Sequence, residues 1–242
     1  LKGLVVDSVT VNGAAATFAR DTNAAQTKYK LVVTPATPVD GVFTTVVGYH
    51  GTPTNHTDAD GSTEGWMTTS DGATFLNQPI GAMTGYPNNN TNQDKATYRF
   101  TLDVPKVING GDSAAVSNGV LTSRSAPAGG RWTWVWDVVK PMPPSLSMIS
   151  IGRYNMSTPV DGLDITLASG RVVQEWSFWD PAASNAGYSS MRNNLKNYLD
   201  FFEARYGPYP GNSIGMVFDN TSGINYALET QDRPFFPGSV TT

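Results

Sequence analysis

The sequence contains no cysteine and only two histidines, His50 and His56, in 242 residues. The absence of cysteine excludes a disulfide framework, a thiolate metal site and a cysteine nucleophile. A hydrolytic zinc takes three protein ligands, and the His-Glu-x-x-His motif that supplies two of them is missing. Two ligands without a third cannot make such a site, so a surface or turn role is expected for both histidines. We therefore expect no catalytic residue and no bound metal in this chain.

Charge and long apolar runs are also scarce. Charged residues make up 15% of the chain, the formal net charge is -4 and the sequence pI is near 5.1. Because no basic run is present, the chain lacks the electrostatic pattern of a nucleic-acid-binding protein. No apolar run approaches the roughly 20 residues of a membrane-spanning helix. We expect neither a nucleic-acid partner nor a membrane span, and the abundance of Thr, Asn, Gly and Ala suits a secreted or extracellular bacterial protein.

Glycine and proline are abundant instead, with 24 and 16 residues. This composition is typical of short strands joined by many turns, so the predicted fold class is mainly β. The pair Asn12-Gly13 is the strongest hairpin signal. Residues 51–72 are predicted to form a polar surface loop anchored by Trp66, and residues 77–92 an irregular segment. The strands predicted for this part cover residues 4–11, 14–19, 29–34, 42–49, 95–104, 114–123, 131–138 and 145–154.

Trp132, Trp134 and Trp136 fall on one face of one predicted strand, because side chains alternate along a strand. Such a row could be a flat platform for carbohydrate. More often it packs inside a sandwich, and we favour the core interpretation.

The chain changes character after residue 156. Short strands are predicted at residues 163–167, 172–178 and 214–219. One helix is predicted at residues 189–206, because apolar side chains recur there at helical spacing and Gly207-Pro208 ends the pattern. We expect this helix to bury one face.

A last extended segment is predicted at residues 224–232. Along it Tyr226, Leu228 and Thr230 would face one way, whereas Ala227 and Glu229 would face the other. The residue pattern alone favours an edge strand that leaves Glu229 in water, as most glutamates are.

Residues 226–234 read Tyr-Ala-Leu-Glu-Thr-Gln-Asp-Arg-Pro. This run resembles the Gly-Ala-Met-Glu-Asn exopeptidase strand of aminopeptidase N-type zinc metallopeptidases, which are gluzincins, in its actinobacterial form. The resemblance implies that Glu229 binds the free α-amino group of a peptide and that the backbone of Ala227 and Leu228 pairs with the substrate. Tyr226 belongs to the same predicted binding segment. An anionic acceptor on a rigid element suits an ammonium group that leaves water.

A second segment departs from the family pattern. Residues 78–82, Gln-Pro-Ile-Gly-Ala, resemble a stretch in which the residue before Gly-Ala is usually an acid or a glutamine that helps to hold the substrate amine. Ile80 cannot do this. Gln78 lies two residues earlier and would point to the same side of an extended chain, so we predict that it substitutes.

The resemblance extends over an ordered series of segments: residues 94–101, 116–121, 132–134, 141–142, 151–154 and 201–210. It implies an antiparallel, saddle-like β-sandwich domain at residues 1–156, which is expected to lack its first strands. Residues 157–242 would then be a small α+β segment that opens a thermolysin-like catalytic domain, without its zinc-binding helix.

The resemblance thus implies the N-terminal portion of a secreted zinc aminopeptidase, inactive alone because zinc belongs to the missing part of the parent enzyme. A peptide N-terminus is the expected substrate. A second chain that carries the zinc domain, or self-association, is expected to cover an apolar face left open. The alternative is a non-catalytic binding or interaction module derived from such a peptidase, which Ile80 favours and the intact run at 226–234 disfavours.

Overall fold

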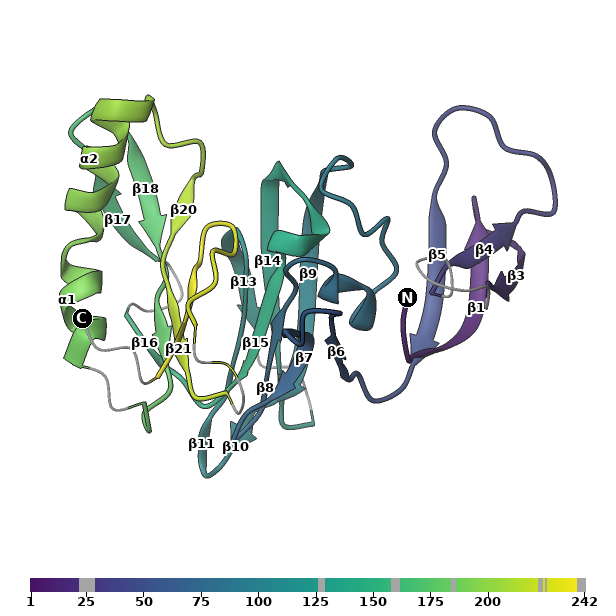
Figure 1. The fold of residues 1–242 in the computed structure, drawn as a ribbon, viewed down its shortest axis with the longest axis horizontal. Coiled ribbons are helices and arrows are strands. Elements are labelled where there is room, and N and C mark those ends of the chain that lie inside the picture. The colour runs from purple at the N-terminus through teal and green to yellow at the C-terminus, as the bar shows by residue number, and fades with distance from the viewer. Residues whose placement is uncertain are drawn as a thin grey trace.

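The computed structural model describes residues 1–21, 29–125, 129–157, 162–183, 186–221, 224 and 226–238. The described chain is mostly β-strand with a small helical part, so the predicted fold class is confirmed. Figure 1 shows three groups of elements along the long axis: a small N-terminal β-group, central sheets, and a C-terminal part that carries the helices. No helix in the described ranges is long and apolar enough to cross a membrane.

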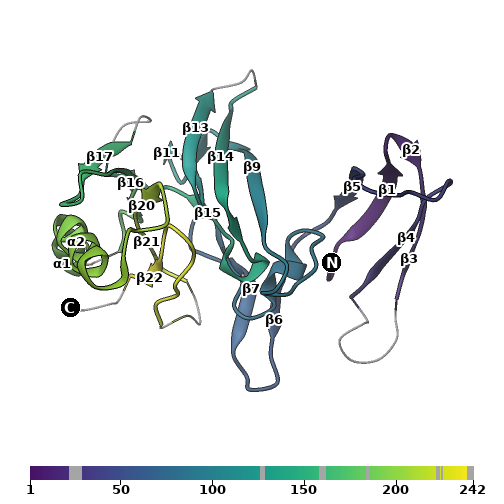
Figure 2. The ribbon, with the colours of Figure 1, turned by 90° about the horizontal axis from the view of Figure 1, so that it is seen from above.

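The N-terminal group contains a three-stranded sheet and a hairpin, set apart from the central sheets in the view from above (Figure 2). The predicted turn at Asn12-Gly13 joins the first two strands, and both residues have positive φ, 48° and 82°, as a tight hairpin turn requires. The sheet contains β1 (Val5–Val11), β2 (Ala14–Ala15) and β5 (Thr45–His50), and the hairpin pairs β3 (Thr17–Arg20) with β4 (Leu31–Thr34).

The centre is a sandwich of two antiparallel sheets, as predicted. Its five-stranded sheet has the order β12 (Ala114–Ser117), β15 (Met148–Gly152), β8 (Ala73–Leu76), β7 (Thr63–Thr68) and β6 (Asn55–Thr57). The three-stranded sheet has the order β13 (Val120–Ser125), β14 (Arg131–Met142) and β9 (Ala96–Pro105), and a short ribbon pairs β10 (Val107–Ile108) with β11 (Gly111–Asp112). Trp134 and Trp136 are fully buried in the core beside Leu76 and Met148, which confirms the core interpretation for these two, whereas Trp132 is only partly buried at the edge of the core.

Two predictions for this centre are wrong. Residues 51–72 are not one loop: they supply β6 and β7, which pair with each other, and β7 pairs with β8. Glu64 on β7 is buried, with its carboxylate bonded to the backbone of Ile80. Residues 114–123 are not one strand, because the chain turns at Gly119, whose φ is +81°, and enters the other sheet. Residues 77–92 are irregular as predicted, apart from the short 3₁₀-helix η2 (Gly81–Thr84).

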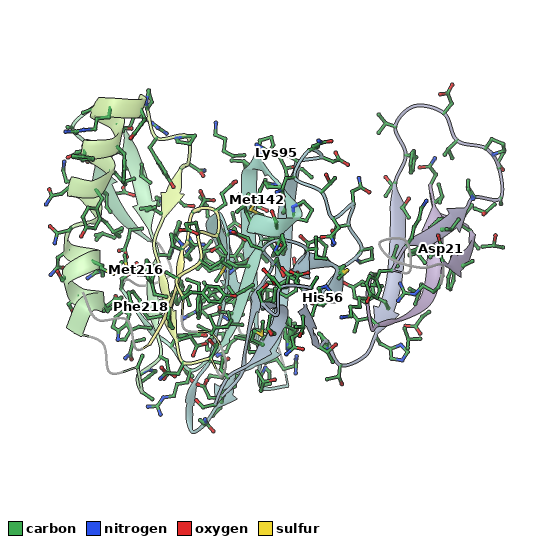
Figure 3. The ribbon with its side chains drawn as sticks, in the orientation of Figure 1. Asp21, His56, Lys95, Met142, Met216 and Phe218 are labelled. Atoms are coloured by element: carbon green, nitrogen blue, oxygen red, sulfur yellow. The ribbon has the colours of Figure 1, made fainter. Side chains whose placement is uncertain are left out.

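The C-terminal part has two mixed sheets covered by helices. One sheet has the order β16 (Asn155–Met156), β19 (Phe178–Trp179), β21 (Val217–Asp219) and β22 (Phe235–Pro237), and the other has the order β17 (Leu163–Thr166), β18 (Val172–Glu175) and β20 (Ser213–Ile214). Met216 and Phe218, labelled in Figure 3, pack with Tyr188 and Leu195 of the helices. On the other side, Trp176 and Phe235 join the core of the sandwich. The domain boundary at residue 156 stays a prediction.

The predicted helix at 189–206 is two helices, α1 (Ala186–Asn193) and α2 (Leu195–Tyr206). Asn194 separates them, and its side-chain amide donates to the carbonyl of Ser190 at 2.9 Å, which competes with the backbone pattern. The burial prediction is also wrong in part. Leu195 and Leu199 are buried, whereas Phe202 and Tyr206 lie 54% and 81% exposed.

Candidate substrate-amine site

The predicted strand at 224–232 is a turn-rich loop in the part of it that the structure describes. Leu228 forms a single antiparallel bridge with Phe235, and each backbone N–H donates to the other residue's carbonyl at 2.9 Å. The chain reverses between them at Asp232, whose φ is 64°, and the Thr230 hydroxyl donates to the carbonyl of Arg233 at 2.6 Å. A reversal so close to Leu228 leaves too few residues for a longer ladder, which is the reason that the strand prediction is wrong.

Arg233 anchors this loop in the core. Its side chain is fully buried, and its guanidinium donates to the backbone carbonyls of Trp176 at 3.1 Å, Gly119 at 2.8 Å and Ser117. The guanidinium also lies 4.6 Å from the ring centre of Trp136. Burial lowers the pKa of Arg233 to about 10, so the group keeps its charge at neutral pH.

Two further hydrogen bonds fix the loop to the sandwich. The Asn118 amide donates to the carbonyl of Gln231 at 2.5 Å, and the Gln231 N–H donates to the carbonyl of Leu146 at 3.2 Å. In Figures 1 and 2 the yellow segment accordingly lies between β21 and the central sheets. Sequence reasoning missed the anchoring role of Arg233, although a lone arginine just before the apolar pair Phe235-Phe236 was a signal for it.

Glu229 and Gln78, 151 residues apart, meet at this loop. The Gln78 side-chain amide donates to the backbone carbonyl of Glu229 at 3.0 Å. Glu229 itself is exposed between Leu228 and Thr230, which are both buried, so its carboxylate projects from a fixed backbone. Because the Gln78 NH₂ group already bonds to protein, its carbonyl oxygen is the atom left to face an ammonium.

Tyr226 stands at the beginning of the loop and ties it to β7. Its hydroxyl donates to the backbone carbonyl of Thr63 at 3.2 Å, and the residue is 38% exposed. Burial and the nearby charge of Glu64 raise the pKa of Tyr226 above its ordinary value, so the phenol is neutral and can donate.

The predicted role of the Leu228 backbone is wrong. Both its N–H and its carbonyl pair with Phe235, so neither can pair with a substrate. Ala227 is exposed. Of the two residues whose backbone was predicted to pair with substrate, Ala227 is therefore the one that could still do so.

Glu64 supports the segment that carries Gln78. It is 2% exposed, and its two carboxylate oxygens accept from the N–H of Ile80 at 3.0 and 3.1 Å. Burial raises the pKa of Glu64 to about 8, and the charge of Asp58 adds to the effect. The sequence analysis placed Glu64 in a loop and so missed it.

The described residues do not fit a catalytic zinc. His56, Asp58 and Glu64 bring one ligand atom each within 4.8 Å of the others. However, the Lys2 ammonium lies 2.8 Å from Nδ1 of His56, so it would repel a zinc ion bound there. The Glu64 carboxylate already accepts hydrogen bonds from the backbone of Ile80. His50 lies on the surface 2.8 Å from Asp7, in the surface role predicted for it.

Residues 211–215, Gly-Asn-Ser-Ile-Gly, match the spacing of a nucleophile elbow, which the sequence analysis did not use. Ser213 lies in β20, fully buried, and its Oγ has no hydrogen-bond partner within the described ranges. A strand, β21, follows it where the elbow needs a helix. Ser213 is therefore a core residue and not a nucleophile.

No family model and no curated protein matches this sequence. Solved structures do match. An M1 zinc metallopeptidase variant from Deinococcus radiodurans bound to the substrate Tyr-Ser-Ala superposes with a TM-score of 0.82 and 22% identity, covering 98% of this chain and 51% of that one. Legionella pneumophila aminopeptidase A in complex with aspartic acid gives 0.67 at 15% identity, covering 96% and 25%, and yeast LTA4 hydrolase gives 0.68 at 17%, covering 97% and 34%.

These matches show the class of fold. The described chain has the aminopeptidase N-type fold found in the N-terminal part of M1 zinc metallopeptidases. It spans about half the length of the Deinococcus radiodurans structures that it matches.

Proposed function

We propose that this chain is the N-terminal portion of a secreted zinc aminopeptidase and that it binds the free amino end of a peptide. The observation that carries the proposal is the convergence of Glu229, Gln78 and Tyr226 on one anchored loop, in a fold shared with a substrate-bound M1 metallopeptidase. The Glu229 carboxylate receives the α-ammonium, and the Gln78 carbonyl oxygen is a second acceptor. The secreted location rests on composition alone.

The loop is suited to this task because its backbone cannot easily move. Arg233 and Asn118 hold its far end to the sandwich, and Tyr226 and Gln78 hold the near end. A carboxylate on such a support loses little freedom when it binds, so more of the ion-pair energy remains as affinity. This rigidity replaces the regular strand that the sequence analysis expected.

Zinc, which would supply the hydrolytic chemistry, belongs in this proposal to polypeptide outside the given sequence. The described residues do not fit that metal, so the chain alone is expected to be inactive. Helix α2 exposes a group of aromatic side chains: Tyr198, Phe201, Phe202 and Tyr206. An exposed apolar group of this kind is typical of a surface that another polypeptide covers. We propose that the zinc-bearing polypeptide, as the rest of the same chain or as a second chain, covers this face.

The experiment compares the parent enzyme with its Glu229→Gln variant on aminoacyl chromogenic substrates. Gln keeps the size of the side chain but loses its charge, so we expect kcat/KM to fall about 100-fold or more. The control is Asp112→Asn, an exposed carboxylate on β11, which should leave kcat/KM unchanged. Equal activity of Glu229→Gln and the parent would remove Glu229 from the site.

A second function, a non-catalytic binding module, has two observations in its favour. Ile80 stands where an amine-binding side chain is expected, and the Gln78 amide is engaged by the Glu229 carbonyl. Intact mass, zinc content and turnover of purified material separate the two functions. A mass near 25.9 kDa without zinc or turnover supports the module for that material, whereas a co-purifying zinc-bearing chain supports the enzyme.

A further inference from the structure

Three aspartates from separate segments converge where the central sandwich meets the C-terminal sheets. Asp71 lies in the turn between β7 and β8, Asp180 directly follows β19, and Asp219 ends β21. One carboxylate oxygen of each lies within 4.8 Å of the other two. This cluster does not include the loop that carries Glu229.

The cluster is buried and its partners carry no charge. Asp180 is 4% exposed, Asp219 is fully buried and Asp71 is half-buried. Within the described ranges, none of the three lies within 4 Å of a basic side chain. The donors to the three carboxylates are the backbone N–H groups of Arg153, Ala182 and Asn220 and the hydroxyls of Thr69, Thr74 and Tyr154.

Asp180 provides the second observation. One of its oxygens accepts from the N–H of Ala182 at 2.7 Å, but Oδ2 is buried without a hydrogen-bond partner among the described residues. The Thr221 hydroxyl is likewise buried and unpartnered, and Thr221 bridges to Thr69, whose hydroxyl donates to Asp71. A buried carboxylate oxygen without a partner costs several kcal/mol unless a cation or donor satisfies it.

The burial of two neighbouring acidic side chains also favours a bound cation. Asp180 and Asp219 are both buried, so little water reaches their carboxylates. A divalent cation would neutralise them and satisfy the free oxygen of Asp180.

We propose that Asp71, Asp180 and Asp219 bind a Ca²⁺ ion. The donor set is oxygen only, which selects a hard cation over zinc. Ca²⁺ fits better than Mg²⁺, because Mg²⁺ keeps several waters whereas two of these three carboxylates are buried. The ion would join the β7–β8 turn of the sandwich to β19 and β21, so it would act as a structural link between the two parts.

Terbium luminescence tests the site directly. Tb³⁺ substitutes for Ca²⁺, and Tyr154, whose hydroxyl donates to Asp219, is an aromatic sensitiser at the site. After treatment with EDTA the chain should bind one Tb³⁺ with enhanced emission, and Ca²⁺ should displace it at concentrations at least tenfold lower than Mg²⁺. Failure of Ca²⁺ to displace Tb³⁺, or equal displacement by Mg²⁺, overturns the assignment of the ion.

A pair of variants tests the residues. Asp180→Asn keeps the shape and the bond to Ala182 but removes the charge, so terbium emission should be lost while circular dichroism remains native. Asp112→Asn, an exposed carboxylate on β11, should bind as the wild type does.

Thermal melting gives an independent result. In EDTA, Asp180→Asn should melt above the wild type, because a buried charge is gone, whereas in Ca²⁺ the order should reverse. An unchanged order with and without Ca²⁺ would overturn the proposed site. If Asp180→Asn does not fold, Asp71→Asn at the half-buried edge takes its place in both measurements, with the same expected results.

Discussion

At the residue scale, the candidate site depends on groups that are buried against the usual preference of their type. Arg233 is a charged side chain in the core, and it is tolerated because three backbone carbonyls and an aromatic face replace its water. Glu64 is a buried carboxylate held by the backbone of Ile80. Each fixes a segment that carries a residue of the proposed amine site.

Replacing Arg233 with leucine should strongly destabilise the chain. The carbonyls of Ser117, Gly119 and Trp176 would lose their donor, and at about 1 kcal/mol or more for each buried group the free energy of unfolding should fall by about 3 kcal/mol or more. The matched control is Arg99→Leu, which breaks an exposed pair with Asp137 and should change the free energy of unfolding far less. Urea unfolding measures both, and equal losses would contradict the anchoring role.

Glu64 should make stability depend on pH. Its pKa is about 8 in the folded chain against an ordinary 4.5, so between these values the folded state binds the extra proton. Stability should therefore fall as pH rises from about 4.5 to 8. Melting temperatures of the wild type and Glu64→Gln across this range test the point. The decline should be shallower in the variant, and parallel curves would assign the pH dependence to other groups.

At the scale of elements, single backbone positions decide where strands and helices end. Gly119 lets the chain leave one sheet of the sandwich and enter the other, and Asn194 divides the predicted helix into α1 and α2. Asp232, at positive φ, reverses the C-terminal loop so that Glu229 projects from a turn instead of a strand.

Gly119→Ala should be much more damaging than the same change in an open turn. A Cβ at Gly119 would collide with the backbone carbonyl of Asp137, and the positive φ adds strain, so we expect a loss of about 3 kcal/mol. Gly13 has nearly the same φ but no atom within 4 Å of the added Cβ, so Gly13→Ala should lose about 1 kcal/mol. Chemical unfolding measures the free energy of unfolding of both variants. A larger loss for Gly119→Ala would show the cost of the collision beyond that of backbone strain, whereas equal losses would exclude the collision.

At the scale of the whole molecule, the C-terminal part holds the sandwich on one side and leaves helix α2 open on the other. Trp176, Phe178 and Phe235 enter the core of the sandwich. The opposite surface presents Phe201, Phe202 and Tyr206. An exposed aromatic group of this kind is typical of a surface that another polypeptide covers.

The isolated chain should therefore self-associate through α2. Phe202→Ser should lower the association constant at least tenfold in sedimentation experiments, because it removes apolar area from the exposed group. Val42→Ser is the control, since Val42 is fully exposed outside this group and should leave association unchanged. A wild type that stays monomeric at high concentration would contradict the prediction.

The sequence by itself determined the mainly β class, the hairpin at Asn12-Gly13 and the burial of Trp134 and Trp136, because local turn chemistry and alternation of side chains depend on near neighbours. It also placed Gln78, Tyr226 and Glu229 in one proposed site, through a resemblance to a family rather than through spacing. Tertiary structure alone decided the rest. Glu64, Arg233, Asp71 and Asp219 have hydrogen-bond partners in distant segments of the chain, so no local pattern could show which groups would satisfy these side chains.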